Sequence, residues 1–300
     1  MTTKSSNMPH LPKTLDTEPE RQAPSFVIRL LRDRSGTVGL ILVVFFTIIS
    51  LLGLFEITRY PVLEQHPIDR LQAPSLDYWF GTDQFGRDTF SRIMKGGANS
   101  LQVSVISVSV STLIGTVIGI FAGYVGGIVD TILMRIMDIL FAFPSLLLAL
   151  LVVTIIGAGL SSTVLAITVV YTPIFARVAR GPVLSLKNAE FVTAARCLGA
   201  KDWRIIAHHI FPNMRTVLIV QVTLALSWAL ITEAGLSFLG LGTQPPDASW
   251  GLMLSANRGL AEIAPWLILF PALSIMLMVL GFNLLGDGLR DVLDPYLKSE

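Results

Sequence analysis

The chain of 300 residues is 52% hydrophobic and 14% charged, and its mean hydropathy is +0.67. Soluble globular chains carry about 25% charged residues, so this composition is typical of a membrane protein and not of a soluble domain. The formal net charge of +1 gives no indication of a nucleic-acid partner, and a single cysteine, Cys197, excludes a disulfide within the chain.

The N-terminal part combines a polar segment with an apolar run. Residues 1–28 are rich in Thr, Pro, Glu and Lys without periodicity, so we expect residues 1–35 to form a largely disordered tail. The run Thr37–Phe55, TVGLILVVFFTIISLLGLF, is long enough to cross a bilayer. A cleaved signal peptide is the alternative, but a long polar tail precedes the run and no small-x-small cleavage site follows it promptly. We therefore predict a retained transmembrane helix.

Further apolar runs reach or approach the ~20 residues that a membrane-spanning helix needs. They are Leu101–Tyr124, Ile132–Ile156, Leu160–Phe175 (continuing to Val178), Thr216–Leu239 and Trp266–Leu285. The sequence thus predicts an all-α membrane protein with six transmembrane helices, an even number that places both termini on one side. Lys and Arg are more frequent on that side, which predicts cytoplasmic N- and C-termini.

The longest external segment is predicted at residues 56–98. Its most patterned part reads GTDQFGRDTFSRIMKGG, in which Gly81 and Gly86 bracket an expected turn. Asp88 is suited to cap a short helix, Thr89–Lys95, and Gly96 is suited to end it.

Two features of the predicted membrane helices concern their packing and shape. Gly115, Gly119 and Gly123 share one helix face, and small residues let another helix approach closely. We expect this face to pack within the chain, although a second chain is the alternative. Pro144, in FAFPSLLLAL, removes a backbone hydrogen bond and should kink the third helix, either as part of a gate or as a structural feature.

Ionisable residues inside the bilayer are costly and each suggests a function. Arg135 and Asp138 are three residues apart and can pair on one helix face. Glu233 lies in the outer half of the fifth predicted helix. It could form a hydrogen bond to a neighbouring helix, line a translocation path or take part in proton coupling. The last role has little support because no His, Asp or Lys relay accompanies it.

The sequence contains no recognisable catalytic motif, so we do not expect an enzyme. It has neither a Gly-Lys-Ser/Thr phosphate loop nor a His-Glu-x-x-His pair. His208 and His209 would point about 100° apart on a helix, which is unsuited to a shared metal site. GDGLRDVLDP (286–295) lacks the acidic spacing of a calcium loop and is better explained as a turn that ends the last helix. Cys197 is expected to serve in packing.

A charged stretch, AEFVTAARCLGAKDWRIIAHHIFPN (189–213), interrupts the apolar sequence between the fourth and fifth runs. Its periodicity predicts a helix, a turn at Gly199 and a second helix that Pro212 ends. The apolar faces would be Phe191, Ala194, Ala195 and Leu198 in the first helix and Trp203, Ile206, Ala207 and Ile210 in the second. Such helices could rest on anionic lipid, but their shortness and the small Ala patch favour docking into a protein groove.

This stretch resembles the cytoplasmic EAA loop of binding-protein-dependent ABC importer permeases. Ala194, Ala195, Gly199 and Pro212 match that pattern, whereas Thr193, His209 and Phe211 stand where the family often has Glu, Ile and Leu. Four further segments are similar to the C-type permease of dipeptide, oligopeptide, nickel or glutathione importers. They are FGTDQFGRDTFSRIMKGGANSL, FAFPSLLLAL, EAGLSFLGLGTQPPDASWGLML and FNLLGDGLRDVLDP, so the resemblance covers nearly everything from residue 25 onward.

The resemblance implies the type I ABC importer permease fold. Residues 36–98 would be the first transmembrane helix and external loop, residues 99–288 the shared permease domain with a coupling loop at 180–215, and residues 289–300 a cytoplasmic tail. Expected partners are a homologous B-type permease subunit in a heterodimer, two cytoplasmic ATPase subunits that bind ATP and Mg, an extracytoplasmic binding protein and the lipid of a bacterial inner membrane. This chain itself would bind no cofactor.

The resemblance and the residues themselves suggest roles for individual positions. The ATPase-coupling set would be Phe191, Ala194, Ala195, Gly199, Trp203, Ile206 and Pro212. Glu233 and Pro144 are candidates for the translocation path or gate. Asp83, Arg87 and Asp88 would shape the external vestibule or contact the binding protein, unless they only lock a turn through their own salt bridge.

The alternative function is a stand-alone ion-coupled secondary transporter, and the sequence leaves the substrate open.

Overall fold

The computed structural model describes residues 26–293. These residues form helices and connecting loops and contain no β-strand beyond an isolated bridge between Thr82 and Asp88. The described chain begins with α1 (Phe26–Arg32) and α2 (Arg34–Leu54). Asp33 separates the two helices and caps α2, because its carboxylate accepts hydrogen bonds from the Gly36 amide and the Ser35 hydroxyl. These bonds lower the pKa of Asp33. Residues 1–25 lie outside the described range, and the predicted disordered tail is wrong for its last part, which is helical.

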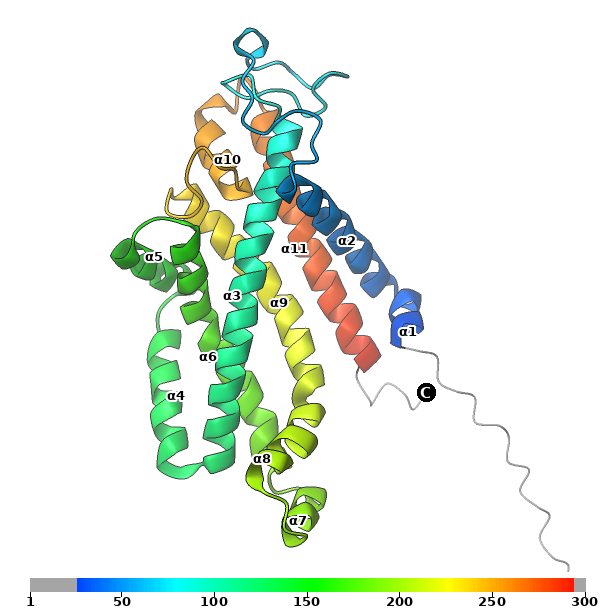
Figure 1. Cartoon of the computed structure of the whole chain (residues 1–300), viewed down its shortest axis with the longest axis vertical. Coiled ribbons are helices and arrows are strands. Elements are labelled where there is room, and N and C mark those ends of the chain that lie inside the picture. Colours follow the sequence, from blue (N-terminus) through cyan, green and yellow to red (C-terminus); the bar gives the residue numbers. More distant parts are fainter. Residues whose placement is uncertain (1–25, 294–300) are drawn as a thin grey trace, which may run out of the picture.

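Within residues 26–293, five helical stretches are long and apolar enough to cross a membrane, and a bent pair of shorter helices gives up to six spans. The long stretches are α2, α3 (Thr89–Val125), α6 (Leu160–Leu186), the continuous stretch Asp202–Phe238 that contains α9 (Phe211–Phe238), and α11 (Trp266–Leu293). In Figure 1 they form a bundle with residues 56–88 and α10 (Trp250–Asn257) at one end and α7 (Glu190–Cys197) and α8 (Asp202–Ile205) at the other. The predicted all-α membrane architecture is therefore confirmed.

The third predicted helix is broken into two. α4 (Gly127–Phe141) and α5 (Ser145–Ile156) meet at an angle of 91°. Pro144 precedes α5 and has an extended ψ of 131°, which an α-helix cannot include. The expected kink at Pro144 is thus present, but as a complete break, and α5 runs across the direction of the long helices (Figure 1).

The glycine face of α3 packs against α6 of the same chain. A Cβ added at Gly119 would lie 2.3 Å from the Ala176 carbonyl oxygen, and one at Gly115 would lie 2.6 Å from the Thr172 carbonyl oxygen. Such distances leave no room for a side chain, so the two backbones are in direct contact. The prediction that this face packs within the chain is confirmed.

Another backbone contact joins α2 to the end of α11. A Cβ at Gly288 would lie 2.4 Å from the Gly36 Cα. The prediction that GDGL ends the last helix is wrong, because α11 continues to Leu293. The glycines there serve close packing instead of a turn. Residues 294–300, most of the predicted C-terminal tail, lie outside the described range.

The expected short helix Thr89–Lys95 is also wrong, since α3 continues without interruption through Gly96. Gly96 and Gly97 face Trp250 at the start of α10, where a Cβ at Gly97 would lie 2.8 Å from the Trp250 ring. The indole nitrogen of Trp250 donates a hydrogen bond to the Ile93 carbonyl at 3.0 Å. The absence of side chains at these glycines therefore lets α10 pack closely against α3.

Ion pairs fix α4 to α6, but not in the expected combination. Asp138 accepts a hydrogen bond from Arg177 of α6 at 2.7 Å, and the predicted pair of Asp138 with Arg135 is absent from the described contacts. Farther along the same two helices, the guanidinium of Arg180 in α6 donates two hydrogen bonds of 2.6 Å to the carboxylate of Asp130 in α4. The Arg180–Asp130 pair is bidentate, which makes it stronger and more directional than a single contact. Both acidic residues of α4, Asp130 and Asp138, thus pair with arginines of α6.

Candidate coupling loop and translocation surface

α7 and α8 form a compact projection at one end of the bundle (Figure 1). α7 is connected to the end of α6 by residues 187–189, and α8 continues through a π-helical turn, Ile206–Ile210, into α9. The helix–turn–helix predicted for residues 189–213 is thus present. Its position between two of the long helices means that a force on the projection acts on both.

The projection has a buried face and an exposed apolar face. Val192, Ile205 and Ile210 are fully buried and join the core between α3, α6 and α9. In contrast, Leu198 is 89% exposed, Trp203 64% and Phe191 46%. Large apolar side chains at such exposure on a charged projection indicate a surface that a partner covers. Of the other predicted coupling residues, Ala194 is exposed, whereas Ala195 and Ile206 are half-buried.

Gly199 forms the turn between α7 and α8. Its φ of +82° lies in the left-handed region, where residues with a Cβ are strained, so the turn requires the glycine that the sequence places there. No neighbouring atom lies within 4 Å of an added Cβ. The turn therefore points into open space. Cys197 is exposed beside it, so the packing role expected for this residue is wrong.

Pro212 does not end the second helix as predicted. The chain remains helical from Asp202 to Phe238, and Pro212 occupies the first turn of α9. A proline in a helix lacks the N–H that would bond four residues back. The preceding π-helical turn accommodates this, because the Phe211 amide donates to the Ile206 carbonyl and the Asn213 side chain donates to the His209 carbonyl at 2.6 Å. π-turns of this kind are frequent at functional sites.

Polar contacts attach the projection to the end of α3. The Tyr124 hydroxyl donates to Asp202 Oδ1 at 2.5 Å, and Arg196 Nη2 lies 3.5 Å from the same hydroxyl. This contact raises the pKa of the Arg196 guanidinium. Lys187 Nζ donates to the Gly123 carbonyl at 2.7 Å. The projection is consequently bonded to α3 in addition to its covalent links with α6 and α9.

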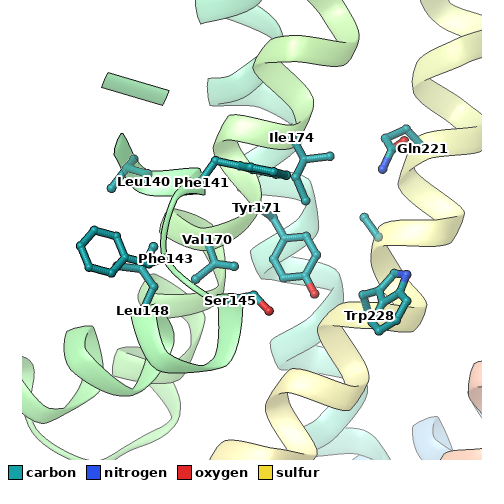
Figure 2. A pocket seen from close by; sticks show the side chains of 11 residues that line it. Leu140, Phe141, Phe143, Ser145, Leu148, Val170, Tyr171, Ile174, Gln221 and Trp228 are labelled. Atoms are coloured by element: carbon teal, nitrogen blue, oxygen red, sulfur yellow. The ribbon is translucent and has the colours of Figure 1, made fainter. Parts of the chain in front are cut away.

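A cavity of about 370 Å³ lies beside the bend between α4 and α5. Figure 2 shows Tyr171 of α6 between Ser145, at the start of α5, and Trp228 of α9, with Gln221 on the same helix as Trp228. The Tyr171 hydroxyl also lies 3.3 Å from the Thr232 hydroxyl. The remaining walls are apolar and include Leu140, Phe141, Phe143, Leu148, Val170, Ile174 and Ala225. Pro144 contributes by placing Ser145 at this surface.

Glu233 does not line this cavity. It is fully buried, and its Oε1 accepts a hydrogen bond from Ser237 one turn along α9 at 2.6 Å. A Cβ at Gly251 of α10 would lie 2.2 Å from the carbonyl oxygen of the adjacent residue Ala234, so α10 covers this side of α9. The geometry favours a structural role for Glu233, but its hydrogen bond to Ser237 lies within α9 and not between helices. It gives no support for a place of Glu233 on the translocation path.

The external turn is locked by its own contacts, as the alternative prediction held. Asp83 is buried and accepts hydrogen bonds from the amides of Phe85 and Arg87 and from Arg87 Nε at 2.7 Å. Asp88 is also buried and caps α3 through the Ser91 amide and hydroxyl. In the same segment, burial and the carboxylate of Asp69 raise the pKa of Tyr78 to about 12.

Some residues at these surfaces were not singled out by the sequence analysis. Gln221, Ala225 and Trp228 are spaced i, i+4 and i+7 in an apolar helix, and the polar groups of Gln221 and Trp228 on this one face could have indicated the cavity. Tyr124 and Asp202 carry no such signal, because residues far apart in sequence form their contact.

Comparison with known proteins agrees with this architecture. The sequence model of the family described as "Binding-protein-dependent transport system inner membrane component" matches residues 115–299. The dipeptide transport system permease protein DppC of Alkalihalophilus pseudofirmus is 45% identical over 271 residues, which cover 90% of this chain and 89% of that protein. The glutathione transport system permease protein GsiD of Pectobacterium atrosepticum is 46% identical over 232 residues, 77% of either chain.

A solved structure supports the fold. The inward-facing MetNI methionine ABC transporter superimposes with a TM-score of 0.56 at 18% identity, covering 68% of this chain and 97% of that one. These comparisons give no support to the alternative of a stand-alone secondary transporter. The chain belongs to the family of binding-protein-dependent transport system inner membrane components, and it is a permease subunit of an ABC importer.

Proposed function

We propose that this chain forms one half of the translocation pathway for peptides, at the cavity beside the α4–α5 bend. Its named relatives include dipeptide and glutathione permeases, and both substrates contain peptide groups. The lining supplies an amide, hydroxyls and aromatic rings, from Gln221, Ser145, Tyr171 and Trp228. These groups suit peptide groups and apolar side chains, whereas the lining residues include no imidazole, carboxylate or thiol for a nickel ion.

The observation that carries the ATP-driven part of this function is the exposed apolar face of α7, α8 and the turn between them. Phe191, Leu198 and Trp203 would insert into a groove on a cytoplasmic ATPase subunit, whose own site binds ATP and Mg. When ATP closes the ATPase pair, the groove would favour one position of the projection over another. Only such a difference in affinity can shift the permease between inward-open and outward-open states. This chain would itself catalyse nothing.

A homologous B-type permease subunit would cover the open side of the cavity. The outward face of α4 carries a row of exposed apolar residues, Ile128, Ile132 and Ile139, and α5 carries another, Leu147, Leu151 and Ile155. Side chains four residues apart share a helix face. Trp228 is 61% exposed at the rim of the same cavity. Together these residues would offer apolar contacts to the second half of the pathway.

The proposed orientation places α7 and α8 in the cytoplasm of a bacterial inner membrane. Arg196, Lys201 and Arg204 on the projection agree with the preference of basic residues for that side. Residues 56–88 and α10 would then face the extracytoplasmic binding protein, which delivers the substrate.

Reconstitution tests this function. The chain would be purified with its B-type subunit and two ATPase subunits, inserted into liposomes and supplied with the binding protein and a radiolabelled dipeptide. We expect uptake that requires both ATP with Mg and the binding protein, and that vanadate stops. Uptake driven by a proton or sodium gradient without ATP would contradict the proposal.

A further inference from the structure

A second cavity, of about 440 Å³, lies at the end of the bundle opposite to α7 and α8. It is enclosed by the turn at residues 83–87, the first turn of α3, the loop at residues 245–247 and one face of α10. Leu252, Met253 and Leu267 supply apolar walls. Pockets of this size, with apolar walls and a few polar groups, are typical of small-molecule sites.

The buried charges at this cavity do not balance. Asp83 pairs with Arg87 at 2.7 Å, and its other oxygen accepts two backbone amides. Arg92 lies farther away, with Nε 3.7 Å from the same Asp83 oxygen. One carboxylate thus faces two guanidinium groups, and the side chain of Arg92 is only 8% exposed. Arg92 therefore shares a counter-ion that Arg87 contacts more closely, and a buried cation that is only weakly paired is costly.

Two polar atoms of the lining have no hydrogen-bond partner among the described residues. They are Nη1 of Arg92 and the hydroxyl oxygen of Thr89, both buried and three residues apart in the first turn of α3. Guanidinium groups bind carboxylates with charge-assisted hydrogen bonds, and a hydroxyl can donate to the same group. This arrangement is suited to a ligand carboxylate.

The other acidic residues nearby leave this position open. Asp88 is directed to the helix end, where the Ser91 amide and hydroxyl bond its carboxylate. Asp247 lines the cavity but is exposed and forms no ion pair within 4 Å of Arg92. A ligand that carries a carboxylate alone would be repelled by Asp247. A zwitterion would meet Arg92 with its carboxylate and Asp247 with its ammonium group.

We propose that this cavity is a binding site for a small zwitterionic peptide, whose carboxylate contacts Arg92 and Thr89 and whose amino group contacts Asp247. The inference rests on the proposed function for its orientation, because the cavity would open toward the side from which substrate arrives. It would hold a substrate on the permease outside the cavity at the α4–α5 bend.

The test measures binding of radiolabelled dialanine to the complete transporter in nanodiscs, without ATP and without the binding protein. We expect dialanine to bind, and dialanine amide and N-acetyl-dialanine to compete about tenfold more weakly or worse, since each lacks one charged contact. Arg92→Gln should lower the affinity for dialanine to a similar degree. Arg258→Gln is the matched control, because it removes an exposed positive charge beside α10 that does not line the cavity.

Asp247→Asn should abolish the preference for dialanine over its N-acetyl form while the preference over the amide persists. Ala256→Trp fills the cavity from the exposed side of α10 and should block binding without altering a charge, which covers the case that Arg92→Gln does not fold. Equal binding of dialanine and its amide, or unchanged affinity in both Arg92→Gln and Ala256→Trp, would overturn the site and leave only buried water there. Failure of this site can be distinguished from failure of the proposed importer function, because uptake assays with ATP and binding protein measure the importer function independently.

Discussion

Tyr124, at the end of α3, donates a hydrogen bond of 2.5 Å to Asp202, at the start of α8. Arg196 of α7 approaches the same hydroxyl at 3.5 Å, so both helices of the projection contact one side chain of α3. Because these contacts join the projection directly to α3, a displacement of the projection can reach α3 without passing through α6 or α9. The structure thereby gives the proposed coupling loop a third connection to the bundle.

Removing this connection should uncouple transport from hydrolysis. We expect Tyr124→Phe and Asp202→Asn each to lower the peptide transported per ATP several-fold, while ATP hydrolysis continues, since the projection stays docked but moves α3 less. The double variant should be no worse than either single variant, because both remove the same bond. Uptake and phosphate release, measured together in proteoliposomes, provide the ratio.

Tyr78→Phe is the matched control for this experiment. It removes a tyrosine–aspartate hydrogen bond of 3.0 Å, to Asp69, at the other end of the molecule. We expect its transport per ATP to equal that of the wild type. Additive losses in the Tyr124 and Asp202 double variant would contradict a shared role.

Gly199 provides a test of the turn between α7 and α8. Because its φ is +82° and the space around it is open, Gly199→Asn should be tolerated, whereas Gly199→Val should strain the turn by about 1–2 kcal/mol. Gly199→Asp fits the turn as Asn does but adds a charge to the docking face. We expect Asp, and not Asn, to abolish ATP-dependent uptake while the thermal stability of the membrane bundle is unchanged. Normal uptake by the Asp variant would refute the docking role.

The exposed apolar residues of the projection should determine ATPase assembly. Trp203→Ser removes a side chain that is 64% exposed, so it should leave the stability of this chain within about 0.5 kcal/mol. Buried aromatic anchors of interfaces commonly contribute 2 kcal/mol or more, so we expect about a thirtyfold loss of ATPase affinity. Co-purification at graded salt and biolayer interferometry measure it. Ile68→Ser, at an exposed residue of the external segment, is expected to have no effect.

The contact between α3 and α6 makes a prediction about folding. Gly119→Ala places a Cβ 2.3 Å from the Ala176 carbonyl oxygen, so the helices must separate. Overpacking of this kind costs about 1–3 kcal/mol, and the partner here is rigid backbone. Gly181→Ala, on the exposed face of α6 with no atom within 4 Å, should be neutral or slightly stabilising. Melting temperatures in detergent compare the two, and equal values would argue against the close packing.

The sequence patterns predicted the features that depend on local chemistry. Long apolar runs located the spans, the glycine period indicated a closely packed face on α3, and Gly199 located the turn, because each signal resides in neighbouring residues. The failures involve partners distant in sequence. Asp138 pairs with Arg177 instead of the nearby Arg135, and Glu233 is covered by α10. Periodicity cannot reveal which helix lies opposite a given face.

Pro212 and Gly96 show a second limit of sequence reasoning. Both residues can end a helix, and both were assigned that role, yet each lies inside a continuous helical stretch. A π-helical turn and the Asn213 side chain satisfy the carbonyl groups near Pro212, whereas the lack of a side chain at Gly96 lets α10 approach. For each of these residues, the surrounding contacts therefore determine whether it ends a helix or lies inside one. The shared helix face of Gln221 and Trp228 can be recognised from their spacing in the sequence. Only the structure, with its bend at Pro144, shows that this face lines a cavity.

That cavity can be tested by thiol accessibility, because the chain has a single cysteine to remove. In a Cys197→Ser background, Gln221→Cys and Ser145→Cys should react with a water-soluble maleimide, and a peptide substrate should slow the reaction. Modification should block uptake by narrowing the path. Ala229→Cys is the matched control, since Ala229 is fully buried on the same helix and should not react. Rapid labelling at residue 229, or full transport after labelling at residue 221, would show that the pathway runs elsewhere.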